Sequence, residues 1–200
     1  MERGPQSIQE TISARNETIR SSLDAGYIPM LAFEHEALQT ELEGLLVHQE
    51  EQGSLLRVAM EQSSETWHDN ANQDIIMRES QTTAARGIRT NDTFRRAKVV
   101  DYPPEGDEVT IGSIIEVRFG ESLEIENAII TGTAKGLDIA KAFEDDNGPL
   151  LPEGCTSFTV QSPAGLALLG ARTGEVVSYQ GPKMQVQMEL VSVKQLIPND

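Results

Sequence analysis

Apolar residues recur at helical spacing through the first hundred residues of the chain. A first helix is predicted to begin at the capping-box pattern Ser7–Glu10 and to stop near Gly26. Its apolar face is formed by Ile8, Ile12, Ile19 and Leu23. A second helix is predicted from Pro29, which suits a first helical turn, to Met60. Its apolar series consists of Leu31, Leu38, Leu42, Leu45, Leu46, Leu56 and Met60.

A polar break, Gln62–Asn70, separates this second helix from a third helix predicted over Ala71–Ala97. The third helix has a weak apolar face, made of Ile75, Ala85, Ile88 and Phe94. Two long helices with thin apolar faces and a short polar connection are typical of an antiparallel helical hairpin or coiled coil. Two helices of an ordinary bundle are the alternative. The second helix, at about 1.5 Å per residue, is roughly 48 Å long.

The second half of the chain alternates apolar and polar residues in short runs, which is typical of β-strands. The runs are Val109–Ile111, Ser113–Val117, Glu124–Ile130, Ser157–Val160, Val176–Tyr179 and Met184–Val193. Ser162–Gly170 is predicted to form a turn and a short helix, so this half is a small antiparallel β domain with one helix. The chain is therefore predicted to be α+β. Its expected parts are a leading helix (1–28), a hairpin arm (29–100, with its tip near 62–72), a proline-marked linker (101–108) and the β domain (109–197).

Composition narrows the classes of function. The net charge is −16, which argues against a protein that coats nucleic acid or a polybasic membrane-surface protein. A single cysteine, Cys155, excludes an intramolecular disulfide and a multi-cysteine metal site. No stretch approaches the roughly 18 apolar residues of a membrane span, and the N-terminus lacks an apolar signal region. We therefore expect a cytoplasmic protein.

The run Ser162-Pro-Ala-Gly-Leu-Ala-Leu-Leu-Gly170 resembles the Ser-Pro-x-Gly-x-Ala-Leu-Leu-Gly motif of the bacterial GreA/GreB transcript-cleavage factors. Arg172, Gly174, Glu175 and Val176 continue the likeness, and Val109–Ser113 is similar to the strand that opens the family's C-terminal domain. In the hairpin, Asp69-Asn70-Ala71 is similar to the family's Glu-Asn-Ala tip, and Ala97–Asp101 to the close of its second helix. The resemblance covers roughly residues 62–197; residues 1–28 have no counterpart in it.

The resemblance implies a C-terminal domain that is FKBP-like in fold without prolyl isomerase activity. Ser162 and Pro163 would dock it on the rim of the secondary channel of RNA polymerase, with Asn70 as a further contact. The arm would enter the channel. The tip carboxylates of Asp69 and Glu65 would help to hold a Mg²⁺ ion, shared with the polymerase, so that backtracked RNA is hydrolysed. The protein would be an accessory factor and not itself an enzyme, without stable binding to free nucleic acid.

The tip departs from the family pattern, in which two acidic residues stand three positions apart. Asp69 takes the second position, but Thr66 occupies the first, and Glu65 supplies a carboxylate at a spacing of four. Asp69 and Asn70 also suit helix capping, and His68 could tune or replace a metal ligand. Three functions stay open: cleavage stimulation, inhibition or modulation of polymerase without cleavage, and a chaperone-like interaction module unrelated to transcription.

Overall fold

The computed structural model describes residues 5–63, 71–120, 122–134 and 151–196, and they form two compact units. Glu36–Arg96 form one unit, and the described residues before and after this segment form the other. This division differs from the ranges expected from the sequence, because the N-terminal 35 residues belong with the β domain. The predicted α+β class is confirmed.

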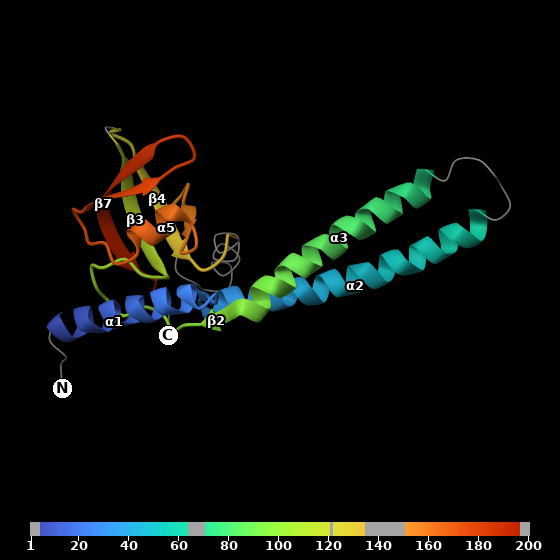
Figure 1. The fold of residues 1–200 in the computed structure, drawn as a ribbon, viewed down its shortest axis with the longest axis horizontal. Helices are drawn as coiled ribbons and strands as arrows, with labels where there is room; N and C mark the ends of the chain where they lie inside the picture. The colour runs from blue at the N-terminus through green and yellow to red at the C-terminus, as the bar shows by residue number, and fades with distance from the viewer. Residues whose placement is uncertain (1–4, 64–70, 121, 135–150, 197–200) are drawn as a thin grey trace. The chain divides into compact units, whose positions relative to one another are not determined.

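The helical unit is made of two long helices, α2 (Ala32–Ser63) and α3 (Ala71–Arg96), which run antiparallel to each other (Figure 1). Their shared seam buries Gln52 and Thr90. At one edge of the seam, Arg86 Nη2 lies 2.7 Å from Glu41 Oε1 and joins the two helices. The predicted antiparallel hairpin is confirmed.

The start of the hairpin differs from the prediction, because Pro29 is not a helical residue. It lies in strand β1 (Ile28–Met30), which pairs in parallel with β2 (Ala97–Val99). Neither strand is predicted from the sequence, because three-residue strands carry too little periodicity to be recognised. Ala97, predicted as the last residue of the third helix, begins β2 instead. The β1–β2 pair places the entry to α2 beside the exit from α3.

The β domain contains a five-stranded sheet with the order β5-β4-β3-β7-β6. Its strands, all five within two residues of the predicted bounds, are β3 (Ser113–Phe119), β4 (Ile125–Thr131), β5 (Thr156–Thr159), β6 (Val176–Gln180) and β7 (Gln185–Gln195). The expected antiparallel pairing holds for β3–β4, β3–β7 and β6–β7, whereas β4 and β5 pair in parallel. A parallel pair needs a long crossover, and 24 residues separate these two strands. The predicted strand at Val109–Ile111 is wrong: these residues are buried but belong to no strand.

The core of the β domain is completed by the N-terminal segment. Alternate residues of β3 and β7, such as Ile115 and Leu190, are buried together with Ile19, Leu31 and Phe33 in one cluster. Each fully buried side chain of this size contributes about 1.5–3 kcal/mol relative to exposure. The N-terminal segment is therefore part of the β domain's own core.

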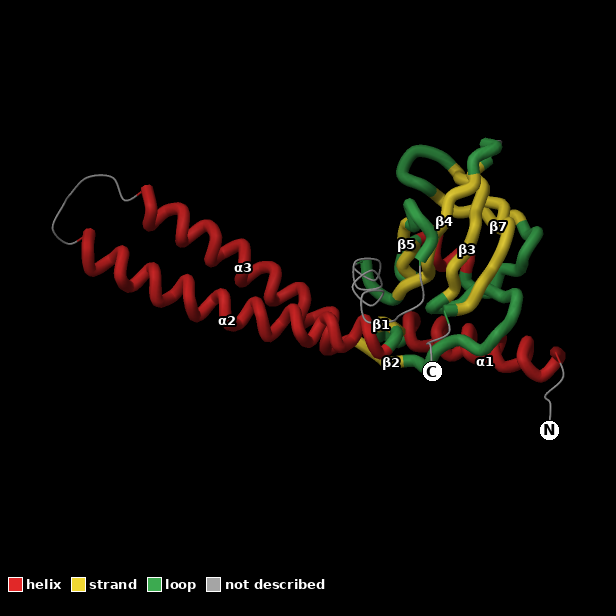
Figure 2. The backbone as a smooth tube through the Cα atoms, turned by 180° about the vertical axis from the view of Figure 1, so that it is seen from behind, coloured by secondary structure: helices red, strands yellow, loops and turns green. Residues whose placement is uncertain are grey.

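Helix α1 (Pro5–Asp24) lies along one end of the sheet domain (Figure 2). Its Asn16 Nδ2 donates to Glu108 Oε1 and to the Val109 carbonyl, both at 3.0 Å, and its Ser13 Oγ donates to Glu108 Oε2 at 3.0 Å. Arg20 donates to the Leu169 carbonyl. The leading helix is thus fixed to the β domain by side chains from the middle of its length.

A buried carboxylate, Glu34, organises the junction between α2 and the sheet. Glu34 Oε2 accepts a hydrogen bond from the Leu31 N–H at 3.0 Å, which caps the first turn of α2. Glu34 Oε1 accepts from the N–H groups of Gly132 and Thr133, both at 3.1 Å, just beyond β4. Only glycine fits at position 132, because an added Cβ would lie 2.2 Å from the Pro29 carbonyl oxygen.

Burial raises the pKa of Glu34 above its ordinary value near 4.5, and the backbone N–H groups oppose this shift. The folded protein therefore binds a proton at Glu34 more tightly than the unfolded chain does. The stabilisation due to this proton is fully present below pH 4.5 and is lost as the pH rises through the raised pKa.

We predict that Glu34→Gln lowers the free energy of unfolding by about 1–3 kcal/mol, because the amide NH2 group cannot accept a hydrogen bond from the backbone N–H groups, whereas both oxygens of the carboxyl group can, protonated or not. The deficit relative to wild type should be largest near pH 4.5 and should shrink toward pH 7.5, as measured by denaturant unfolding at each pH. Glu36→Gln, an exposed change on the same helical turn, is the control and should have little effect. A deficit that grows with pH would contradict the assigned direction.

Candidate functional site

The predicted tip residues Glu65, Thr66, Asp69 and Asn70 lie outside the described residues. The described chain ends at Ser63 on one side and resumes at Ala71 on the other. The seven residues between them connect the far ends of two antiparallel helices. Their carboxylates and their metal-binding role stay predictions.

The second predicted site, at Ser162 and Pro163, is described in full. Ser162 is the N-cap of the short helix α5 (Pro163–Leu168): its Oγ accepts from the Gly165 N–H at 3.0 Å and donates to the Thr159 carbonyl at 2.8 Å. Pro163 takes the first helical position, where its missing N–H costs nothing. The two residues therefore define the start of α5.

Gly165 has a steric role in the same turn. A Cβ added at this position would lie 2.0 Å from the Thr159 carbonyl oxygen and 2.7 Å from its carbon. Helix α5 packs so closely on the end of β5 that only glycine fits. The structure of the turn alone therefore explains the serine, the proline and the glycine of the motif, without any contact with a partner.

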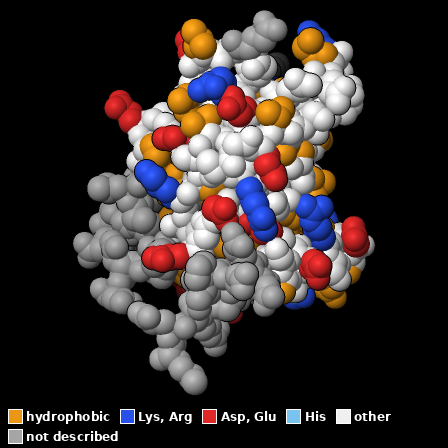
Figure 3. Space-filling model, turned by 90° about the vertical axis from the view of Figure 1, so that its left-hand side faces the viewer, with side chains coloured by type: hydrophobic (Ala, Val, Ile, Leu, Met, Phe, Trp, Pro, Cys, Tyr) orange, Lys and Arg blue, Asp and Glu red, His pale blue; other side chains and the backbone are white. Residues whose placement is uncertain are grey.

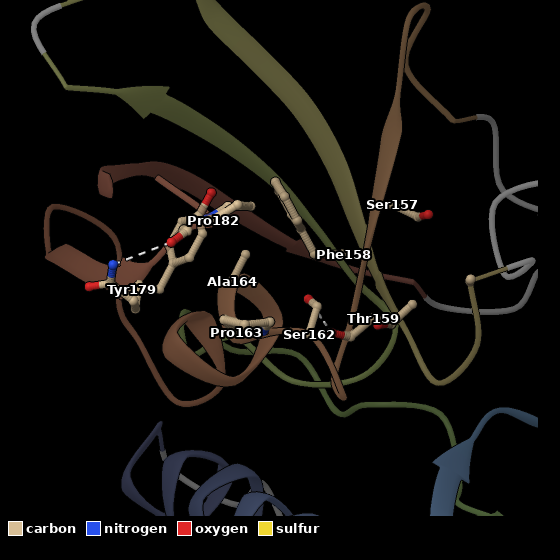
Figure 4. Close-up of a pocket in the computed structure, with 11 residues that line it drawn as sticks. Ser157, Phe158, Thr159, Ser162, Pro163, Ala164, Tyr179 and Pro182 are labelled. Carbon is tan, nitrogen blue, oxygen red and sulfur yellow. Dashed lines mark hydrogen bonds between the residues drawn. The ribbon is translucent and has the colours of Figure 1, made fainter. Parts of the chain in front are cut away.

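Beside this turn, the surface is hollowed between α5, β5 and the loop after β6 (Figure 4). The hollow has a volume of about 640 Å³. Phe158, Tyr179 and Pro182 line it together with Pro163 and Ala164, and among the residues that the structure describes no charged side chain lines it. Of these, Pro163 and Pro182 are exposed. An uncharged hollow with aromatic and proline walls is suited to bind an apolar part of another protein and not a phosphate backbone.

The charged side chains nearby do not form a basic surface. On the face drawn in Figure 3, Lys and Arg are interspersed with Asp and Glu. Arg118 Nη1 lies 2.8 Å from Glu189 Oε2, and Arg172 Nη2 lies 3.5 Å from Glu108 Oε2. Within the described part of the chain, no group of three His, Cys, Asp or Glu side chains is placed to hold a metal ion. None of the helices there is long and apolar enough to cross a membrane.

Comparison with curated proteins gives relatives over most of the chain. The transcription elongation factor GreA of Thermomicrobium roseum is 26% identical over 168 residues, which cover 84% of this chain and 97% of the relative. GreA of Clostridioides difficile is 27% identical over 165 residues, covering 80% of this chain and 91% of the relative. At this level of identity the chain is a distant relative of these GreA factors. No protein-family model matches it.

Solved structures of Gre-type proteins are also similar to the chain. Gfh1 of Thermus aquaticus is 22% identical with a TM-score of 0.37, and its match covers 84% of this chain and 97% of that one. A GreA/GreB factor of Nitrosomonas europaea is 18% identical with a TM-score of 0.31, and its match covers 84% of this chain and 98% of that one.

The sequence predicts the turn at Ser162 but gives no sign of the hollow beside it. Phe158 lies on β5 and Tyr179 on β6, which are the two outer strands of the sheet, and Pro182 lies in the loop after β6. Nothing in their spacing along the sequence shows that they converge. The motif at Ser162–Gly170 thus forms one wall of the hollow, and the other wall comes from β6 and the loop after it.

We predict a graded loss of stability in the Ser162 turn. Gly165→Ala should lower the free energy of unfolding by about 3 kcal/mol or more, because α5 must move away from Thr159. Ser162→Ala should cost about 1 kcal/mol through the lost cap, and Pro163→Ala less than that, since its side chain is exposed. Denaturant unfolding followed by circular dichroism gives the order, and an alanine at 165 that is tolerated would contradict the close approach.

Proposed function

We propose that this protein binds bacterial RNA polymerase during elongation, as an accessory factor and not as an enzyme of its own. The observation that carries the proposal is the turn at Ser162 beside an uncharged hollow, in a chain related to GreA over 97% of that relative's length. The turn and the hollow supply a docking surface on the rim of the secondary channel. The relation to GreA disfavours an interaction module unrelated to transcription.

The hairpin would then act as an arm. Helix α2 has 32 residues, which at 1.5 Å per residue span about 48 Å. An arm of this length would carry Glu65 and Asp69 into the channel. A Mg²⁺ ion shared with the polymerase would activate the water that cleaves backtracked RNA. The tip carboxylates would supply hard oxygen ligands to it and orient that water.

A second function is favoured by one observation, the threonine at position 66. Without a carboxylate at the first acidic position, the tip could fill the channel and leave the cleavage reaction unassisted or blocked. The protein would then be a channel-binding inhibitor or modulator of polymerase. Both functions need the docking surface, and they differ only in what the tip does.

The docking proposal predicts that Pro163→Glu weakens binding to core RNA polymerase at least tenfold. Glutamate suits the first turn of a helix, so α5 should persist while a charge enters the uncharged rim. Binding is measured by interferometry on immobilised polymerase, with circular dichroism to check the fold. Thr173→Glu, an exposed position that does not line the hollow, is the matched control. Equal affinity of both variants would contradict the docking proposal.

The cleavage proposal predicts faster Mg²⁺-dependent shortening of RNA in backtracked complexes when the protein is added. Asp69→Ala should abolish the effect, Glu65→Ala should reduce it, and Thr66→Asp should raise it by restoring the spacing of three. Asp74→Ala removes an exposed acid from the first turn of α3 and should leave the rate unchanged. If wild-type protein binds polymerase but cleavage stays the same or slows, the inhibitor function takes its place.

A further inference from the structure

The hairpin carries an apolar groove along one side of its seam. The groove has a volume of about 430 Å³ and is lined mainly by Leu42, Leu45 and Leu46 of α2 and by Ala84, Gly87 and Ile88 of α3. Leu46 is 61% exposed and Ile88 is 72% exposed. Apolar side chains this large and this exposed, gathered on one groove, indicate a surface that another molecule covers.

The shape of the groove is self-complementary. Leu46 and Ile88 project from it, while Ala84 and Gly87 leave space between them, and a Cβ added at Gly87 would meet no atom within 4 Å. The same face therefore carries projecting apolar side chains and an apolar depression that could receive the side chains of a second copy. This is the requirement for a two-fold symmetric contact, in which the same patch serves both copies.

The opposite net charges of α2 and α3 determine how two such faces can pack together. From Glu36 onward, helix α2 has six glutamates and one arginine, a net charge of −5, whereas α3 has five arginines and three acidic residues, a net charge of +2. Within one hairpin, the Arg86–Glu41 pair already joins α3 to α2 at 2.7 Å. A second hairpin can repeat this attraction only if its α3 lies on α2 of the first. The opposite arrangement, α2 on α2, places two helix segments of charge −5 side by side.

We propose that two copies of this protein associate through the groove. In the dimer, α2 of each copy packs antiparallel to α3 of the other, and the two hairpins form a four-helix bundle with Leu46 and Ile88 in its centre. Burial of the four exposed side chains drives the association, and the attraction between α2 and α3 sets its register. The dimer goes beyond the proposed function, because it requires no polymerase.

The test is sedimentation equilibrium on the full chain between roughly 1 and 200 µM, a range that brackets a micromolar Kd. We expect a monomer–dimer equilibrium whose Kd rises at least tenfold in Leu46→Glu and in Ile88→Glu. The control is Leu55→Glu, which adds the same charge at a 58% exposed leucine of α2 that does not line the groove. Circular dichroism must show unchanged helix content in all three variants. A monomer at every concentration, or a dimer that tolerates both groove variants, would overturn the proposal.

The orientation is tested separately by cross-linking in a Cys155→Ser background. Leu46→Cys and Ile88→Cys proteins are prepared individually and treated with a short bismaleimide, alone and as a mixture. A cross-linked dimer that forms far more efficiently in the mixture supports α2 against α3. Efficient cross-linking of the Leu46→Cys protein to itself places α2 on α2 and overturns the arrangement, even if a dimer exists.

Discussion

The carboxylate of Glu34 joins parts of the chain that are about a hundred residues apart. An isolated buried charge is costly, and here three backbone N–H groups offset that cost by donating to its two oxygens. Because one oxygen caps α2 and the other holds the segment after β4, Glu34 fixes where the long helix starts against the sheet. The bare backbone of Gly132 permits this contact, since any side chain there would strike Pro29. Phe33, next to Glu34, is buried in the core of the β domain.

A second buried glutamate, Glu108, has the equivalent role for α1. It accepts hydrogen bonds from Ser13 and Asn16 and pairs with Arg172, so a helix, the linker and the turn after α5 meet at one carboxylate. The Arg20 guanidinium adds a contact to the Leu169 carbonyl at the end of α5. The leading helix therefore supports the short helix whose first turn carries Ser162 and Pro163. In a chain with 32 acidic residues, two of the most buried ones determine how the N-terminal segment joins the domain.

Local patterns in the sequence were enough to predict the long helices, most strands of the sheet and the turn at Ser162, because each depends on neighbours a few positions away. Features that depend on distant partners could not be predicted. Pro29 suits a helix start by its own chemistry and is drawn into a strand by its parallel pairing with Lys98. Val109–Ile111 alternates like a strand but is buried without joining the sheet. The hollow needs Phe158 and Tyr179 to converge from separate strands, and no spacing along the chain encodes that. The tip, whose chemistry the motif suggested most directly, is a prediction still.

Under the proposed function, the negative net charge and the uncharged hollow beside Ser162 together determine which partner the protein binds. A protein of charge −16 is repelled by free DNA and RNA, and so it is kept from the non-specific binding that basic factors must overcome. The same repulsion would oppose its approach to a polymerase filled with nucleic acid, were it not screened beyond about 8 Å at physiological ionic strength. Association must then depend on short-range contacts that carry no charge of their own. The hollow beside Ser162 meets that condition, since none of the described residues that line it is charged. The negative net charge thus disfavours binding to free nucleic acid, and the uncharged contact surface provides the binding to RNA polymerase.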